Sequence, residues 1–351
     1  MNITEKQSLS FGQTYGTLQN TGVYDFLKKA EKGNKFPLFL KQKPLRFWTD
    51  LWLQSKKTKV KASTYIRYRN LIEHHIDPYL GDFKMNSIRL KTADAYVSYL
   101  LHCGRLDKTG GLSAKTVEDI LSILKDVFRL AQNYGVVRNS WVGHLSVRKE
   151  ETAIRVLTHQ EEKALLSVLL HNTDSYKLGV LIAMYSGIRI GELCALQWKD
   201  VSLTEKVMKI DKTMQRLQKE KTDTVFKTQL LVSSPKSFSA NRVIPLPDFL
   251  VKKMEPFAAA PNAFILSNSC RSVVEPRTMQ NKIHLYLKEC HIQGASFHTL
   301  RHTFATRCVE LGFDIKTLSE ILGHSSVKIT LDRYVHTSLE QKRQNMQKIV
   351  I

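Results

Sequence analysis

Apolar side chains recur at helical spacing through the first half of the chain, from about residue 43 onward. Tyr65, Tyr68, Leu71, Ile72 and Ile76 follow one another at steps of three and four, which places them on one face of a helix. Four basic residues are interleaved with them and fall largely on other faces: Lys59, Lys61, Arg67 and Arg69. The pattern predicts an amphipathic helix with a basic exposed side.

A second helix is clearer, because both of its ends are marked. Ser113 can cap its first turn, and Gly135 can end it. The apolar stripe between them comprises Val117, Ile120, Leu121, Leu124, Val127, Phe128 and Ala131. With further helices near 45–56 and 91–106, the pattern predicts a small all-helical domain over residues 43–146.

The periodicity changes in the second half of the chain. Thr158 and Glu161 have the spacing of a capping box, and helices are predicted near 159–171 and 175–186. Three short segments then have strand character: 207–210, 226–232 and 243–246. From about residue 275 the pattern is helical again. The expected fold is mostly α, with a small antiparallel sheet in the second domain.

The segments between and around these domains are polar and charged. Residues 1–42 are predicted to be a basic N-terminal arm, and the charged, aperiodic residues 147–157 a linker. The second domain therefore covers residues 158–351. No internal repeat is visible.

Composition narrows the class of partner. The chain has 351 residues, a formal net charge of +21 and a pI near 9.7. Such a basic chain is expected to bind a polyanion, although charge alone does not separate DNA from RNA or from a membrane surface. The five scattered cysteines fit buried thiols in a reducing compartment and not a disulfide framework, and neither a membrane span nor a secretion signal is evident. These features predict a cytoplasmic protein.

One local cluster suggests chemistry. His298 and Arg301 lie three residues apart on a predicted helix, His302 lies nearby, and His324 and Tyr334 follow. A guanidinium matches the charge that develops on phosphate oxygens during phosphodiester transfer, and a tyrosine hydroxyl can attack phosphorus if positive charge or a base activates it. A general acid must then protonate the departing sugar oxygen.

Two other segments could complete such a site. Arg189 follows a glycine at the end of an apolar helix, and Glu192 is close enough to hold its guanidinium, although taken alone the pair is an ordinary salt bridge at a helix start. Lys236 lies between two predicted strands, where an isolated lysine would be an ordinary hairpin residue.

Taken together, these motifs resemble the tyrosine recombinase (phage integrase) family over about residues 45–345. Gly187-Ile188-Arg189-Ile190-Gly191-Glu192-Leu193 looks like the first arginine box, and Pro235-Lys236 before Arg242-Val243-Ile244-Pro245-Leu246 looks like the lysine hairpin. His298-Thr299-Leu300-Arg301-His302 resembles the second box, and Leu322-Gly323-His324 with Tyr334 the third.

The resemblance implies six catalytic residues: Arg189, Lys236, His298, Arg301, His324 and Tyr334. Lys221 and Lys227 are competitors for the lysine, and His302 is interpreted as a structural partner. Tyr334 would form a 3′-phosphotyrosyl link, Lys236 would protonate the 5′ oxygen, and His298 would assist proton transfer at Tyr334. Neither cofactor, metal nor ATP is expected.

The resemblance also implies an architecture and partners. A SAM-like core-binding domain (43–146) and a catalytic domain (158–351) would clamp double-stranded DNA at specific attachment sites of a mobile element. Four copies would assemble on the DNA by exchanging C-terminal tails. An accessory DNA-bending or excision factor could take part. The tail, residues 339–351, ends in Ile349-Val350-Ile351; it is either a frayed terminus or this assembly element.

Three other interpretations remain. His298, His302 and His324 could be zinc ligands, although no His-Glu-x-x-His motif is present. The chain could be a DNA-binding regulator with a vestigial catalytic set, although no catalytic type is missing. A type IB topoisomerase would share the chemistry but would relax DNA without exchanging partners.

Overall fold

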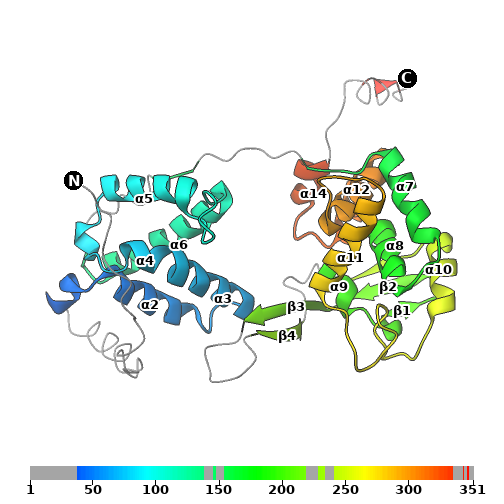
Figure 1. Ribbon diagram of the computed structural model, residues 1–351, viewed down its shortest axis with the longest axis horizontal. Coiled ribbons are helices and arrows are strands. Elements are labelled where there is room, and N and C mark those ends of the chain that lie inside the picture. The colour runs from blue at the N-terminus through cyan, green and yellow to red at the C-terminus, as the bar shows by residue number, and fades with distance from the viewer. Residues whose placement is uncertain are drawn as a thin grey trace. The chain divides into compact units, whose positions relative to one another are not determined.

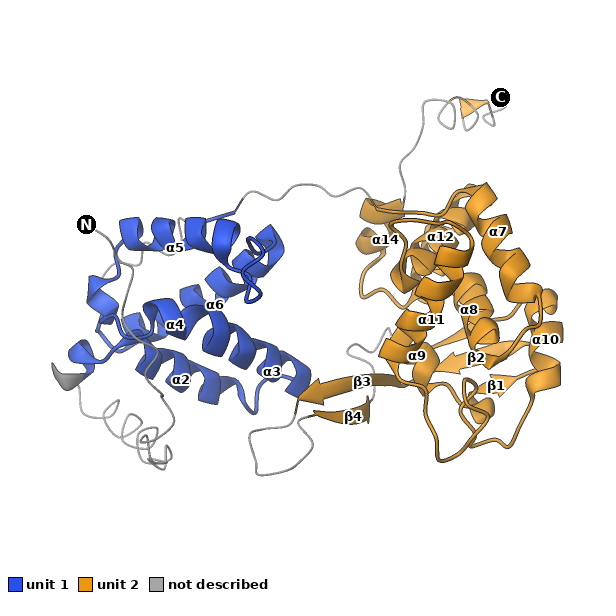
Figure 2. Ribbon diagram, in the orientation of Figure 1, with its two compact units in different colours: residues 1–151 blue, residues 152–351 orange. Residues whose placement is uncertain are grey.

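The structure is a computed structural model that describes most of the chain after residue 37. The described residues are 38–137, 145–147, 154–218, 228–233 and 241–334, with Arg343, Met346 and Gln347. The chain divides into two compact units, residues 1–151 and 152–351 (Figure 2). The boundary between the two units falls within residues 147–157, the segment predicted as a linker.

The described residues of unit 1 form helices joined by turns and short irregular segments (Figure 1). Its helices are α2 (Leu45–Lys56), α3 (Ala62–Leu71), α4 (Asp77–Leu80), α5 (Leu90–Cys103) and α6 (Ala114–Asn133). The predicted ends of α6 are confirmed, since the Ser113 hydroxyl accepts a hydrogen bond from the Thr116 amide at 3.2 Å and Gly135 has a φ of +67°. All seven side chains of its predicted apolar stripe are buried.

The predicted helix through Tyr65 and Ile76 is not uniform. After α3 the chain makes one turn of π-helix, Ile72–Ile76, before α4 begins. Ile72 and Ile76 are still buried, whereas Tyr65 is only half-buried. The Tyr96 hydroxyl donates a 2.8 Å hydrogen bond to the His75 carbonyl and so ties α5 to this turn.

Unit 2 packs helices around two small antiparallel sheets. The strands are β1 (Val201–Ser202), β2 (Val207–Ile210), β3 (Thr213–Gln218), β4 (Thr228–Ser233) and β5 (Arg242–Pro245), in the orders β1-β2-β5 and β3-β4. The helices are α7 (His159–Leu170), α8 (Ser175–Ser186), α9 (Ile190–Ala195), α10 (Asp248–Met254), α11 (Pro276–Glu289), α12 (Phe297–Glu310), α13 (Ile315–Leu322) and α14 (Val327–Tyr334).

The predicted fold class, mostly helical with a small antiparallel sheet, is confirmed. The capping box at the start of α7 forms as predicted, with Thr158 and Glu161 bonding each other's backbone amides. Strand β3 and the short helix α9 were not predicted. None of the helices that the structure describes combines the length and the hydropathy needed to span a bilayer.

Helix α8 forms the centre of unit 2. Its apolar side chains are buried on nearly all sides, and α12 contacts α8, α13 and α14. Gly179 lets the core close on α8, because a Cβ there would lie 2.4 Å from the Leu266 side chain. This packing places the end of α8 and the start of α9 close to α12.

Candidate active site

The first corner of the site lies between α8 and α9. Gly187 ends α8 with a φ of +63°, and Arg189 is the residue that precedes the first turn of α9. The Arg189 guanidinium donates to Glu192 Oε1 at 2.8 Å and to the Gly323 carbonyl at 3.2 Å. The predicted contact between Arg189 and Glu192 is therefore present, and it directs a half-exposed guanidinium toward the segment after α13.

Arg301 lies deeper, on α12. Its Nη1 donates to the Gly187 carbonyl at 2.7 Å and its Nη2 to the Leu322 carbonyl at 2.6 Å, so it joins the ends of α8 and α13. The residue is 2% exposed. Burial, followed by the charge of Arg189, lowers the pKa of Arg301 to about 9, which still leaves it positive at neutral pH.

A third arginine, Arg242 at the start of β5, completes the group of guanidinium ions with Arg189 and Arg301. No role was predicted for it from the sequence. It donates to both carboxylate oxygens of Glu192, at 3.2 and 2.9 Å, and to the Ile321 carbonyl at 2.5 Å. Gly323 has a φ of +63°, and a Cβ there would lie 2.9 Å from Arg242 Nη1. The one signal in the sequence was its position as the first residue of the 242–246 motif, which follows Lys236.

Glu192 connects two of these arginines. It is 3% exposed and accepts hydrogen bonds from both Arg189 and Arg242. Burial alone would raise the pKa of Glu192, but the hydrogen bond and charge of Arg242, together with the charge of Arg189, outweigh it and hold that pKa below its ordinary value. The carboxylate is thus ionised and keeps both guanidiniums in place.

His324 lies in the turn between α13 and α14, and Tyr334 lies at the far end of α14. Gly323 ends α13, and His324 Nδ1 lies 2.9 Å from the Thr330 hydroxyl, which fixes the imidazole ring. Tyr334 is the last residue of α14 and is buried. The two rings are nearly parallel, with centroids 6.4 Å apart.

The hydroxyl of Tyr334 meets an imidazole, but it is that of His302. His302 Nδ1 lies 2.7 Å from the phenolic oxygen. The His298 ring stands edge-on to His302, with centroids 4.5 Å apart. His302, which was interpreted from the sequence as a structural partner, therefore contacts the predicted nucleophile directly.

The charges around these rings shift their titration. Burial, followed by the positive charges of Arg301, Arg189 and Arg333, lowers the pKa of His324 to about 3, and burial with the same arginines lowers that of His298. Burial raises the pKa of Tyr334, while Arg301 and Arg333 act in the opposite direction. At neutral pH the site therefore contains neutral imidazoles and a protonated phenol among guanidinium ions.

The structure brings five of the six predicted residues into one cluster: Arg189, His298, Arg301, His324 and Tyr334. Lys236 and its competitors Lys221 and Lys227 lie outside the described residues. In the described part of the chain, no three His, Cys, Asp or Glu side chains gather as metal ligands would, so His298, His302 and His324 do not form the group that the zinc interpretation needs.

Comparison with known proteins gives the same family for both units. Residues 155–341 match the phage integrase family, and residues 45–101 match the phage integrase N-terminal SAM-like domain. A tyrosine recombinase XerC-like protein of Caldanaerobacter subterraneus subsp. tengcongensis is 24% identical over 308 residues, which cover 80% of this chain and 76% of the relative. The ICEBs1 integrase of Bacillus subtilis is 23% identical, with 85% and 80% covered.

Solved structures share the fold. The Tn1549 transposon integrase in complex with transposon right end DNA superposes with a TM-score of 0.71 at 21% identity, covering 87% of this chain and 99% of that one. Lambda integrase bound to DNA gives a TM-score of 0.60 at 19% identity, covering 88% and 99%.

Proposed function

Because the chain belongs to the phage integrase family of tyrosine recombinases, enzymes that cleave and rejoin DNA, we propose that it is a site-specific recombinase with Tyr334 as its nucleophile. The observation that carries the proposal is the contact set of Tyr334. Its hydroxyl is hydrogen-bonded to an imidazole, and the positive charges of Arg301 and Arg189 act on it.

In the proposed reaction the Tyr334 oxygen attacks the scissile phosphorus, the bond to the 5′ oxygen breaks, and a 3′-phosphotyrosyl ester forms. Arg189 and Arg301 would bind the non-bridging oxygens, where charge develops. A guanidinium has five N–H donors, and two of those of Arg301 are engaged by carbonyls, so the group can be held and still bind phosphate. His324 would add a hydrogen bond.

Two protons must move in this step. The phenol loses one, and the departing 5′ oxygen gains one, which we assign to Lys236 from its position in the sequence. The 5′ hydroxyl of a partner strand then attacks the phosphotyrosyl ester and releases Tyr334. The ester preserves the energy of the phosphodiester bond, so the proposed cycle uses neither ATP nor a metal.

We further propose double-stranded DNA as substrate, at attachment sites of a mobile element that is integrated or excised. The net charge of +21 supports a polyanionic partner, and the named complexes of the Tn1549 and lambda integrases contain DNA. The SAM-like unit 1 and unit 2 would clamp the duplex. The reaction would take place in the cytoplasm, at the nucleoid, with an accessory DNA-bending factor where the element supplies one.

Assembly into a tetramer would use the C-terminal tail, whose residues 339–351 lie outside the described part except for Arg343, Met346 and Gln347. Unit 2 contains an apolar groove of about 790 Å³ that could receive it. The groove is lined by side chains of α7, α8, α12 and α13, and its rim includes the exposed Leu311 and Phe313. An apolar tail end of a neighbouring copy would bury this surface.

The decisive experiment traps the covalent intermediate on a nicked suicide substrate. Tyr334→Phe removes one oxygen and should abolish the protein–DNA adduct on a denaturing gel while DNA binding persists. Tyr286→Phe, at a buried tyrosine on α11, is the matched control and should leave the adduct. An adduct that persists in Tyr334→Phe would show that another residue is the nucleophile. Recombinant junctions, rather than relaxation alone, would separate the recombinase from a topoisomerase.

A further inference from the structure

We propose that His302 is the group that accepts the proton of Tyr334 when the phenol attacks phosphorus. The inference rests on the function proposed above and adds a catalytic residue to it. It changes the role of His302 from a structural partner to a general base, and it places His298 behind His302 in the path of the proton.

The geometry is that of a general base. His302 Nδ1 lies 2.7 Å from the Tyr334 oxygen, within the range in which a proton is transferred directly. The hydroxyl can donate to Nδ1 only if that nitrogen carries no hydrogen, which places the ring hydrogen on Nε2. In that tautomer the neutral ring can receive the proton that the phenol must lose.

His298 is less well placed for this step. Among the described residues, its ring packs against that of His302, with 4.5 Å between the centroids. The imidazole that is hydrogen-bonded to the Tyr334 hydroxyl is that of His302, so we place His302 first in the path of the proton. His298 can therefore influence the basicity of His302, as a neighbouring imidazole does, without itself contacting the phenol.

The surroundings make this base dependent on substrate. His298 and Arg301 face His302 from its own helix, and Arg333 and Tyr334 face it from α14. Burial, followed by these neighbouring charges, lowers the pKa of His302 to about 4, so the ring is a weak base in the free protein. A phosphodiester bound by Arg189 and Arg301 would add negative charge beside these cations and raise that pKa. His302 would then become an effective base only once DNA is in the site.

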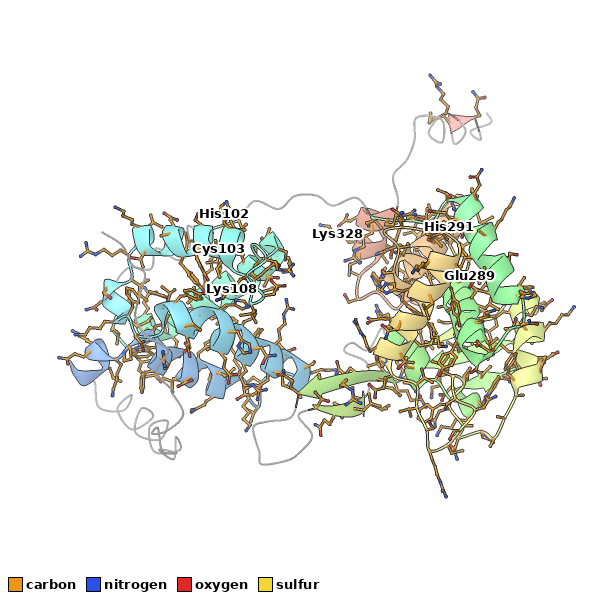
Figure 3. The ribbon with its side chains drawn as sticks, in the orientation of Figure 1. His102, Cys103, Lys108, Glu289, His291 and Lys328 are labelled. Atoms are coloured by element: carbon orange, nitrogen blue, oxygen red, sulfur yellow. The ribbon has the colours of Figure 1, made fainter. Side chains whose placement is uncertain are left out.

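The role can be tested with His302→Asn, His302→Ala and a matched control. The Asn side chain keeps a hydrogen-bonding group near the position of Nδ1 but cannot accept the proton. His291, an exposed residue just after α11 (Figure 3), has a φ of +56°, a conformation that Asn tolerates, so His291→Asn makes the same chemical change away from the site.

We expect both His302 variants to cleave a suicide substrate at least ~100-fold more slowly in a single turnover, with DNA binding unchanged and His291→Asn at the wild-type rate. Their rates should rise more steeply with pH than that of the wild type, because hydroxide must then remove the proton. Added imidazole should restore part of the activity of His302→Ala.

A modified substrate separates this base from the general acid. A sulfur at the 5′ bridging position makes a leaving group that needs no proton. It should rescue Lys236→Ala and leave the defect of the His302 variants in place. Wild-type cleavage by His302→Asn, a pH profile parallel to that of the wild type, or rescue by the sulfur substrate would each overturn the proposal.

The Tyr334→Phe variant keeps the two proposals distinguishable. If Tyr334→Phe still forms the adduct, the proposed nucleophile is wrong. If Tyr334→Phe loses the adduct but the His302 variants cleave normally, the nucleophile stands and only the role of His302 fails. Gel-shift affinities close to that of the wild type would show that the variants are folded.

Discussion

Arg189 and Arg301 have the same side chain but different surroundings. Arg301 is 2% exposed and bonded to two carbonyls, whereas the side chain of Arg189 is 39% exposed and held by Glu192. Arg301 therefore both fastens α8 to α13 and supplies charge. Arg189 is bonded to Glu192 and to the Gly323 carbonyl but stays partly exposed, so its solvent-facing side is the part of the site best placed to bind phosphate.

Replacing Arg189 with lysine tests this difference. Lysine keeps the charge but cannot make two parallel hydrogen bonds to a phosphate, nor the paired contacts with Glu192 and Gly323. We expect cleavage to slow by ~100-fold or more, the scale seen when one transition-state donor is removed. Single-turnover cleavage measures the rate, with Arg277→Lys on the exposed side of α11 as control. A rate near that of the wild type would mean that position 189 supplies charge alone.

At this scale the sequence indicated the chemical types but not all of their contacts. The spacing of His298 and Arg301, and the pairing of Arg189 with Glu192, follow from helical geometry and could be predicted. The roles of Arg242 and His302 could not, because their partners lie 50 and 32 residues away in the chain. Only the packing of β5, α13 and α14 brings these groups together.

At the scale of elements, strong periodicity was informative and short elements were not. Helix α6 could be predicted from its apolar stripe and its caps, and the start of α7 from its capping box. Buried positions repeat every 3.6 residues in a helix, and a cap depends only on neighbouring residues. Strand β3 alternates weakly and is largely polar, and α9 has only six residues, too few to show a period. The π turn after α3 keeps the same face buried, so the apolar pattern does not reveal it.

Arg242 is where three elements meet, and its removal should loosen all of them. Breaking a buried pair costs about 3 kcal/mol or more when the charge left behind has no partner. Arg242→Met would leave the buried Glu192 with Arg189 as its remaining guanidinium partner, so we expect a smaller loss of stability than that. Amide hydrogen exchange in α9 and α13 should report the loss. Lys206→Met, which breaks the exposed pair with Asp248, should leave exchange in these helices unchanged.

The pH dependence of this loss has a definite sign. The pKa of Glu192 is lower in the folded protein than in the unfolded chain, so its ion pairs stabilise the fold above the unfolded pKa and are lost as pH falls through the folded value. The difference in stability between the wild type and Arg242→Met should therefore have its full value at neutral pH and decrease in acid. A difference that stays constant into acid would show that Arg242 acts through packing alone.

At the scale of the whole molecule, the proposed assembly depends on the tail and the groove. Deleting residues 339–351 should leave single-site DNA binding within a few-fold of the wild type but sharply reduce recombination between two sites. Leu311→Asp in the groove should have the same effect, whereas Leu285→Asp, at another exposed leucine outside the groove, should not. Gel shifts and a two-site assay measure the two quantities. Full recombination by the truncated chain would exclude the tail as an assembly element.

If Tyr334 is the nucleophile, it becomes covalently joined to DNA, and this can be tested by identifying the modified residue. The adduct trapped on a suicide substrate can be digested with nuclease and trypsin and analysed by mass spectrometry. Because Arg333 precedes Tyr334 and the next lysine or arginine is Lys342, we expect a nucleotide on the tryptic peptide 334–342, at Tyr334. A nucleotide on peptide 283–288, which contains Tyr286, or on any residue other than Tyr334, would contradict it.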